Sequence, residues 1–164
     1  MPEPRLVYWD SCIFIEAIQQ EPSSLPVLSA IVRAAQAGDV RIVTSALTLA
    51  EVVRAQRSSG TAADEQTIRQ LFDNPYIVVR AVTRAVATDA RAVSRQHGVK
   101  PPDAIHVATA LAAKVSELHT RDGQGRKRGL INLSGLVGTP PLTIAPPRWA
   151  QQQRLLSAAG DDSL

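Results

Sequence analysis

The sequence predicts an α/β protein in which helices cover both faces of a mainly parallel sheet. Short apolar segments, rich in β-branched residues, alternate with longer stretches whose apolar residues recur at helical spacing. Helical stretches follow each of the first three strands, an order that favours parallel strands buried on both sides. With 164 residues, the chain has the length of one such domain.

The predicted strands are short runs bordered by turn or capping residues. A fifth segment, Leu142 to Ala145, could add an edge strand before the prolines that follow it. The four main strands are Arg5 to Trp9, Val40 to Thr44, Tyr76 to Val82 and Glu117 to Thr120.

Helices are predicted between these strands. Gly38 and Gly98 stand where two of them should stop, and Thr83 stands where one should start. The predicted helices are Leu25 to Ala37, Leu47 to Arg57, one from a capping box at Thr61 to about Asp73, Arg84 to His97, and Pro102 to Lys114.

The composition limits what the chain can be. Hydrophobic residues make up 45% and charged residues 20%, as in ordinary globular domains. A single cysteine, Cys12, excludes an internal disulfide framework and thiolate-rich zinc sites. No run of about twenty apolar residues and no apolar leader is present, so we expect a cytoplasmic protein that does not contact membranes.

Four acidic residues lie at the ends of predicted strands or the starts of predicted helices: Asp10, Glu51, Asp103 and Asp122. Parallel strands present their carboxyl ends at one edge of the sheet, where open α/β sheets bind ligands. We therefore expect the four carboxylates to converge. Such a cluster repels itself unless divalent cations neutralise it, and the cations favoured by oxygen ligands, Mg²⁺ and Mn²⁺, support cleavage of phosphodiester bonds.

Each acid also has a purely structural alternative. Asp10 could cap the next helix, and Asp103 could favour a helix dipole in a first turn. Asp122 before Gly123 is a common turn pair, and Glu51 could pair with Arg54 along a helix.

Polar neighbours of the acids are candidates for secondary roles. His106 stands three residues after Asp103 and could reach a metal, although a packed or supporting histidine is more common at such a place. Ser11 and Thr120 could bond a carboxylate, a phosphate or only the backbone. Three arginines beside the acids are expected to hold the backbone of a phosphodiester substrate: Arg121, Arg126 and Arg128.

An ordered set of segments resembles the PIN domain family. The segments are Leu6 to Ser11, Thr44 to Val52, Pro102 to Ala110 and His119 to Asp122. The resemblance implies a three-layer α/β/α sandwich, which we assign to residues 1–147. The polar end of the chain, residues 148–164, is expected to be a flexible tail or a loose helix. The resemblance further implies a Mg²⁺- or Mn²⁺-dependent endoribonuclease in which Asp10, Glu51, Asp103 and Asp122 form the acidic quartet and Ser11 and Thr120 accompany it.

Among PIN proteins, a small single-domain chain most resembles the VapC-type toxins of type II toxin–antitoxin pairs. That resemblance implies a homodimer, an RNA substrate and a small antitoxin partner that blocks the site. Two features depart from the toxins: the glycine-rich basic stretch after Asp122 and the proline-rich C-terminal extension. A PIN-fold module that binds RNA or protein without catalysis, and a structure-specific DNA nuclease, remain the alternatives.

Overall fold

The computed structural model describes residues 3–53 and 62–149. At its centre lies a five-stranded sheet of order β3-β2-β1-β4-β5 in which all neighbouring strands are parallel. The predicted parallel α/β sandwich is confirmed, and the segment before Pro146 does form an edge strand. The strands are β1 (Arg5–Trp9), β2 (Val40–Ser45), β3 (Ile77–Arg80), β4 (Glu117–His119) and β5 (Thr143–Ala145).

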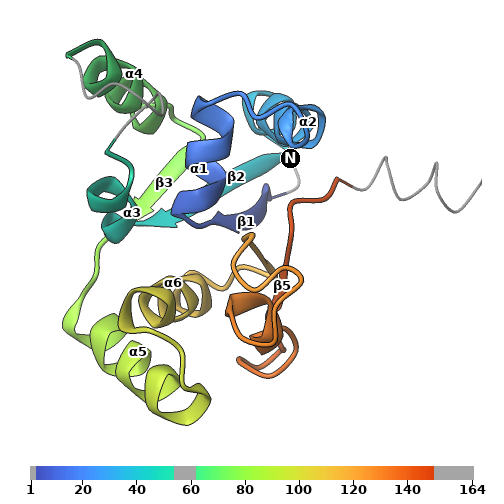
Figure 1. The fold of residues 1–164 in the computed structure, drawn as a ribbon. Coiled ribbons are helices and arrows are strands. Elements are labelled where there is room, and N and C mark those ends of the chain that lie inside the picture. The colour runs from blue at the N-terminus through green and yellow to red at the C-terminus, as the bar shows by residue number, and fades with distance from the viewer. Residues whose placement is uncertain (1–2, 54–61, 150–164) are drawn as a thin grey trace, which may run out of the picture.

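Helices cover the sheet on both sides (Figure 1). The helices α1, α2 and α4 contribute to one core cluster and α6 to the other, with α5 packed on the outside of α6. No helix of the described part of the chain is long and apolar enough to cross a membrane. The helices are α1 (Ser11–Ile18), α2 (Leu25–Gln36), α3 (Ala46–Glu51), α4 (Ala62–Phe72), α5 (Arg84–His97), α6 (Pro101–Ala112) and the 3₁₀ helix η1 (Leu130–Leu133).

The structure shifts several predicted boundaries, and the largest shifts are in one helix and one strand. The helix predicted to run from Leu47 to Arg57 ends at Glu51, because Val52 adopts non-helical backbone angles and packs into the core; residues 54–57 lie outside the described part. The third strand, which was predicted from Tyr76 to Val82, is shorter and spans Ile77–Arg80. The capping residue Thr61 and most of the predicted tail are not described, but Trp149 still packs against the core beyond the predicted limit at residue 147.

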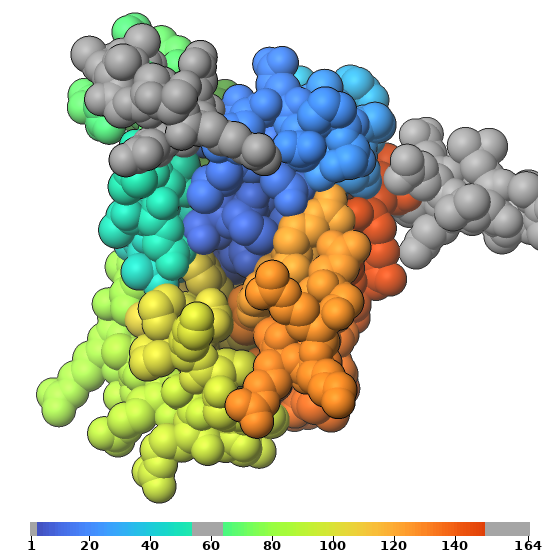
Figure 2. All heavy atoms as spheres, in the orientation of Figure 1, coloured from blue at the N-terminus to red at the C-terminus, as the bar shows by residue number. Residues whose placement is uncertain are grey.

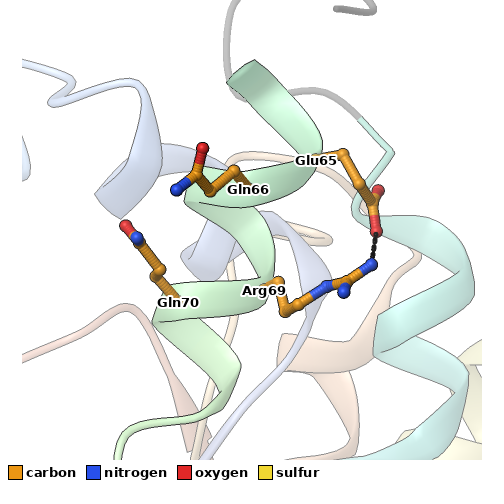
Figure 3. A pocket seen from close by; sticks show the side chains of 4 residues that line it. All are labelled: Glu65, Gln66, Arg69 and Gln70. Atoms are coloured by element: carbon orange, nitrogen blue, oxygen red, sulfur yellow. Dashed lines mark hydrogen bonds and ion pairs between the residues drawn. The ribbon is translucent and has the colours of Figure 1, made fainter. Parts of the chain in front are cut away.

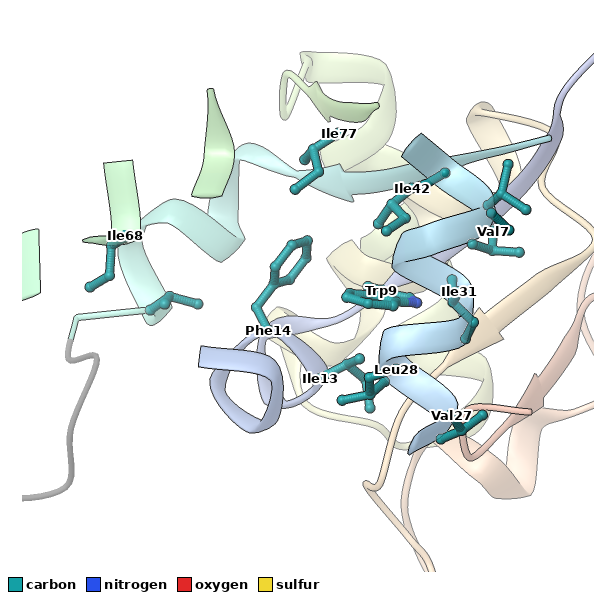
Figure 4. Close-up of a cluster of buried hydrophobic side chains, with 14 residues drawn as sticks. Val7, Trp9, Ile13, Phe14, Val27, Leu28, Ile31, Ile42, Ile68 and Ile77 are labelled. Atoms are coloured by element: carbon teal, nitrogen blue, oxygen red, sulfur yellow. The ribbon is translucent and has the colours of Figure 1, made fainter. Parts of the chain in front are cut away.

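Strand alternation divides the core that flanks the sheet into two clusters, and a third cluster of the described residues lies between α5 and α6. Val7 and Trp9 of β1 point to the side covered by α1 and α2, whereas Tyr8 points to the side covered by α6. Figure 4 shows the first cluster, in which Trp9 and Phe14 lie between the sheet and the helices. Both faces of β1 are thus buried, which explains why its sequence is an apolar run without alternation.

Glu117 gathers several charges at the start of β4. Its carboxylate pairs with Arg5 at 2.7 Å and with Arg148 at 3.4 Å, and it lies 3.1 Å from Nε2 of His119. The hydrogen bond with His119, followed by the charges of the two arginines, lowers the pKa of Glu117 to about 2. This cluster therefore ties both ends of the described chain to a central strand.

The packing of α2 predicts a difference between two leucines of the same helix. Leu28 is 2% exposed and Leu25 is 39% exposed. We expect Leu28→Ala to lower the free energy of unfolding by about 2–5 kcal/mol, because it leaves a cavity, and Leu25→Ala to lower it by less than about 1 kcal/mol. Urea denaturation of the two variants measures both values, and equal losses would contradict this assignment of the core.

The Glu117 cluster predicts a pH-dependent contribution to stability. A carboxylate whose pKa is lowered by folding stabilises the protein above its unfolded pKa of 4.5, and this contribution is lost as the pH falls through its folded value of about 2. We expect Glu117→Gln to destabilise the protein by up to about 3 kcal/mol at pH 7 and by less than half of that at pH 3. Denaturant titrations at both pH values measure the change, and the exposed Glu65→Gln serves as control.

Candidate active site

The four predicted acids line one hollow at the carboxyl edge of the sheet. Asp10 follows β1, Asp122 follows β4, Glu51 ends α3 after β2, and Asp103 lies in the first turn of α6. Figure 2 shows the segments that carry them on one face of the molecule, with α1 in blue, α3 in cyan and the segment after β4 in orange. The hollow has a volume of about 380 Å³ and is lined by Asp10, Ser11, Cys12, Glu51, Asp103, His106, Arg121, Asp122, Gly123, Gln124 and Arg126.

Asp10 is the most deeply buried of these acids, at 5% exposure. Its Oδ1 accepts a hydrogen bond from the backbone N–H of Ile13, so it caps α1, and another from the thiol of Cys12 at 2.8 Å. Burial raises the pKa of Asp10, although the hydrogen bonds from Cys12 and Thr120 act in the opposite direction. The capping role and a place in the hollow are therefore compatible.

The carboxylates of Asp103 and Asp122 are close enough for their negative charges to repel each other. Burial raises the pKa of Asp103, and the negative charges of Asp122 and Asp10 raise it further. The Oδ2 of Asp122 accepts a hydrogen bond from the backbone N–H of Leu130 at 2.8 Å, which closes the basic loop predicted after β4. One carboxylate oxygen of Asp122 is thus engaged in local structure, and the other is not part of that bond.

Glu51 is held by His106. Nε2 of His106 lies 2.9 Å from Oε2 of Glu51, and Nδ1 lies 2.7 Å from the phenol oxygen of Tyr8. The hydrogen bond with His106 lowers the pKa of Glu51 against the opposing effect of burial, and the Ser11 hydroxyl lowers it further. Glu51 therefore stays a carboxylate at neutral pH.

The predicted hydroxyl residues lie beside the acids. Thr120 is fully buried, and its Oγ1 accepts a hydrogen bond from the backbone N–H of Asp122 at 2.9 Å. Since it also bonds Asp10, Thr120 links the ends of β1 and β4. Ser11 lines the hollow, and its side chain forms a hydrogen bond with Glu51.

The three predicted arginines differ in their placement. Nε of Arg121 donates to Glu16 at 3.1 Å and its Nη2 donates to Ser24 at 2.9 Å, so its guanidinium is fixed beside the hollow. Arg126 also lines the hollow and is exposed. Arg128 does not line it, and its contact with RNA stays a prediction.

Sequence reasoning overlooked several residues of this site. Cys12 was considered for disulfides and zinc sites but not for this hollow. It is half-buried and donates a hydrogen bond to a carboxylate of the hollow; its position two residues after Asp10 was the available signal. Tyr8 precedes Asp10 by two positions and was counted only as a strand residue. No sequence pattern pointed to Glu16 or Ser24, because their hydrogen bonds to Arg121 join residues about a hundred positions apart.

The donor set agrees with a hard divalent cation, although the side chains are not gathered around one point. Among residues 3–53 and 62–149, no three His, Cys, Asp or Glu side chains lie close enough to form a ready metal-binding group. Mg²⁺ keeps several of its waters and needs only one or two direct carboxylates. A hollow lined by four carboxylates fits that requirement without a closed shell of protein ligands.

A larger hollow, of about 470 Å³, lies along α4 and is lined by Glu65, Gln66, Arg69 and Gln70 (Figure 3). Glu65 and Arg69 pair at 3.5 Å one helical turn apart, with side chains 69% and 70% exposed. Such a pair is typical of a solvated helix surface. Its residues bring no set of acids together, so volume alone does not make it the better site.

The family model of the PIN domain matches residues 7–129, three quarters of the chain and the whole region that carries the four acids. The chain belongs to the PIN domain family. PIN domains are nucleases that generally use divalent metal ions. This family membership agrees with the acidic hollow found at the carboxyl edge of the sheet.

Solved structures share the fold of this PIN domain. A toxin–antitoxin complex from Klebsiella pneumoniae matches with a TM-score of 0.52 and 23% identity over 72% of this chain and 88% of that chain. VapBC2 from Rickettsia felis, bound to a DNA fragment from their promoter, matches with a TM-score of 0.59 and 16% identity over 85% of this chain and 96% of that chain. At these identities the likeness shows the fold alone. A comparison with curated proteins gives no match.

The burial of Asp10 predicts that this side chain destabilises the metal-free PIN domain. The pKa of Asp10 is raised above 3.8 in the folded protein. Its protonated side chain therefore stabilises the fold at low pH, and this stabilisation is lost as the pH rises through the raised pKa. We expect Asp10→Asn to raise the Tm at pH 7 in EDTA by at least about 2 °C, since the amide still accepts the capping bond. The gain should vanish near pH 3. Thermal denaturation tests this, with the exposed Asp89→Asn as control.

Proposed function

We propose that this PIN protein is a Mg²⁺- or Mn²⁺-dependent endoribonuclease. The observation that carries the proposal is the convergence of Asp10, Glu51, Asp103 and Asp122, from four separate elements, on one hollow. Burial and mutual repulsion raise the pKa of Asp103, as expected where charges are assembled for a cation. A scaffold without a ligand gains nothing from such an arrangement.

The residues divide into direct and supporting roles. When bound, a divalent cation lowers the pKa of a water molecule and neutralises charge on the scissile phosphate. The buried Asp10 and the half-buried Asp103 would hold it through carboxylate oxygens, and Glu51 would supply the oxygen not bonded to His106. Asp122 would contribute the oxygen that is not bonded to Leu130. Because no serine elbow, phosphate-binding loop or cysteine nucleophile motif occurs, water is the expected nucleophile.

Two arginines favour a nucleic-acid substrate at this hollow. Glu16 already fixes Arg121 with its guanidinium beside the acids. Binding a phosphate would therefore cost little further side-chain entropy. Arg126 lies on the exposed loop and extends the positive charge along the same opening. The pairing of acids that hold a cation with arginines at the rim suits a phosphodiester backbone.

We further propose that the chain is the toxin of a toxin–antitoxin pair. The resemblance of its motifs to VapC-type toxins supports this, and the solved structures that share its fold include a toxin–antitoxin complex and VapBC2. An RNA substrate, an antitoxin that covers the hollow, a homodimer and a cytoplasmic location belong to this proposal.

The nuclease proposal predicts metal-dependent RNA cleavage that is lost on removal of Asp10. We expect cleavage of single-stranded RNA in Mg²⁺ or Mn²⁺, none in EDTA, and a loss of at least about 100-fold in kcat for Asp10→Asn, because transition-state charge is then less well neutralised. The control Asp89→Asn should cleave like the wild type. Gel assays with RNA and DNA of the same sequence measure this.

The outcomes separate the candidate functions. Faster cleavage of DNA would support a structure-specific DNA nuclease instead. Equal cleavage by wild type and Asp10→Asn would point to a contaminating enzyme and contradict the proposal. RNA binding without cleavage in any divalent cation would favour a non-catalytic PIN module.

A further inference from the structure

A hydrogen-bonded chain of three buried or half-buried side chains lies behind the acidic hollow. It links Tyr8 of β1, His106 of α6 and Glu51 of α3. We propose that Tyr8 and His106 are positioning residues that determine which oxygen of Glu51 faces the bound cation. This inference rests on the proposed metal-dependent function, but the geometry of the chain can be tested without any metal.

The three residues form a continuous path through the protein interior. Tyr8 is completely buried and His106 is 2% exposed, whereas the side chain of Glu51 is 29% exposed. The distances are 2.7 Å from the phenol oxygen to Nδ1 and 2.9 Å from Nε2 to Oε2. The two rings also meet edge to face, with centroids 5.9 Å apart. The path thus runs from a core strand to the wall of the hollow.

The direction of the hydrogen bonds follows from the chemistry of the end groups. A carboxylate only accepts, so Nε2 of His106 must carry the hydrogen that lies toward Glu51. The phenol oxygen of Tyr8 lies 2.7 Å from Nδ1, and a phenol has a hydrogen to donate, so Tyr8 can donate to Nδ1. The geometry points to one tautomer of His106, with hydrogen on Nε2.

His106 is therefore unsuited to be a metal ligand itself. A histidine binds a metal through the lone pair of one ring nitrogen. Here Tyr8 occupies the lone pair of Nδ1, and Nε2 donates to Glu51. Of the two roles open in the sequence, the supporting one agrees with this arrangement.

Glu51 needs such support because of where it lies. It is the last residue of a helix of only six residues, after which the chain leaves the helical conformation. A glutamate at a helix end has many accessible rotamers, and fixing it in one of them costs side-chain entropy. The bond from His106, which is anchored on the buried α6, holds Oε2 and leaves Oε1 for the hollow.

A second chain of the same design provides an internal comparison. Nε1 of Trp9 donates to Nδ1 of His119 at 3.2 Å, and Nε2 of His119 lies 3.1 Å from Glu117. Glu117, however, is paired with two arginines and does not line the acidic hollow. Changes in this second chain should affect stability but leave cation binding intact.

The first test is the tautomer of His106 in the metal-free protein. Long-range ¹H–¹⁵N NMR of the imidazole should show hydrogen on Nε2 and none on Nδ1. Tyr8→Phe removes the donor to Nδ1 and should shift that nitrogen's signal more than that of Nε2. Hydrogen on Nδ1 in the wild type would overturn the proposed direction of the bonds, whatever the protein does with metals.

The second test is Mn²⁺ affinity, measured by titration calorimetry. His106→Leu should bind Mn²⁺ about 10- to 100-fold more weakly than the wild type, as is usual when a residue that orients a ligand is lost. His106→Gln, whose side-chain amide can donate to Glu51, should recover most of the affinity. Glu117→Gln is the matched control and should bind like the wild type while unfolding more easily.

The outcomes distinguish this inference from the proposed function. If the wild type binds no Mn²⁺, both the proposed function and the positioning role toward a cation fail, and the tautomer result still reports on the hydrogen bonds. If the wild type binds and folded His106→Leu binds equally well, only the positioning role is overturned. Should His106→Leu not fold, a weaker Mn²⁺ affinity of Tyr8→Phe supports the role, and an unchanged affinity overturns it.

Discussion

The parallel pairing of β1 with β4 is the constraint on which the site depends. The chain runs from β1 outward to β3 and then crosses to the other side of β1 to form β4. Where the strand order reverses in this way, the connections diverge and leave a crevice at the carboxyl ends of the strands. The register of Trp9 with His119, and the bond from the Asp10 N–H to the His119 carbonyl, keep the two strand ends level. Asp10 and Thr120 therefore leave the sheet side by side.

This placement makes the negative charges of the site unfavourable for the stability of the fold. Asp10 lies on the deeply buried side of the crevice, and burial is the first cause of the raised pKa of both Asp10 and Asp103. The capping bond from Ile13 and the bond from Cys12 offset only part of this cost. The two apolar clusters on either side of the sheet must supply the remainder. A fold that tolerates such unfavourable charge when empty gains stability from a ligand of opposite charge.

The sequence predicts this fold well where local signals and tertiary packing agree. The limits of β1 and α5 were predicted to the residue, since an apolar run and a Thr83–Gly98 pair of caps leave few alternatives. The limit of α3 was wrong, because burial of Val52 overrides the helical pattern that continues in the sequence. The topology brought the four acids to one edge, but their hydrogen bonds could not be predicted. Arg121 with Glu16, for example, joins positions 105 apart, and no short-range pattern encodes such a contact.

Two adjacent aromatic residues of β1 show how one strand serves stability and the site at once. Tyr8 and Trp9 point to opposite faces of the sheet because side chains alternate along a strand. Each contacts Nδ1 of a buried histidine whose Nε2 meets a glutamate. On one face the glutamate meets arginines, so its charge is neutralised within the protein. On the other face Glu51 meets a hollow lined by further acids, which is the place we propose for a cation. The same arrangement of aromatic residue, histidine and glutamate thus stabilises the fold on one face of the sheet and positions a carboxylate at the acidic hollow on the other.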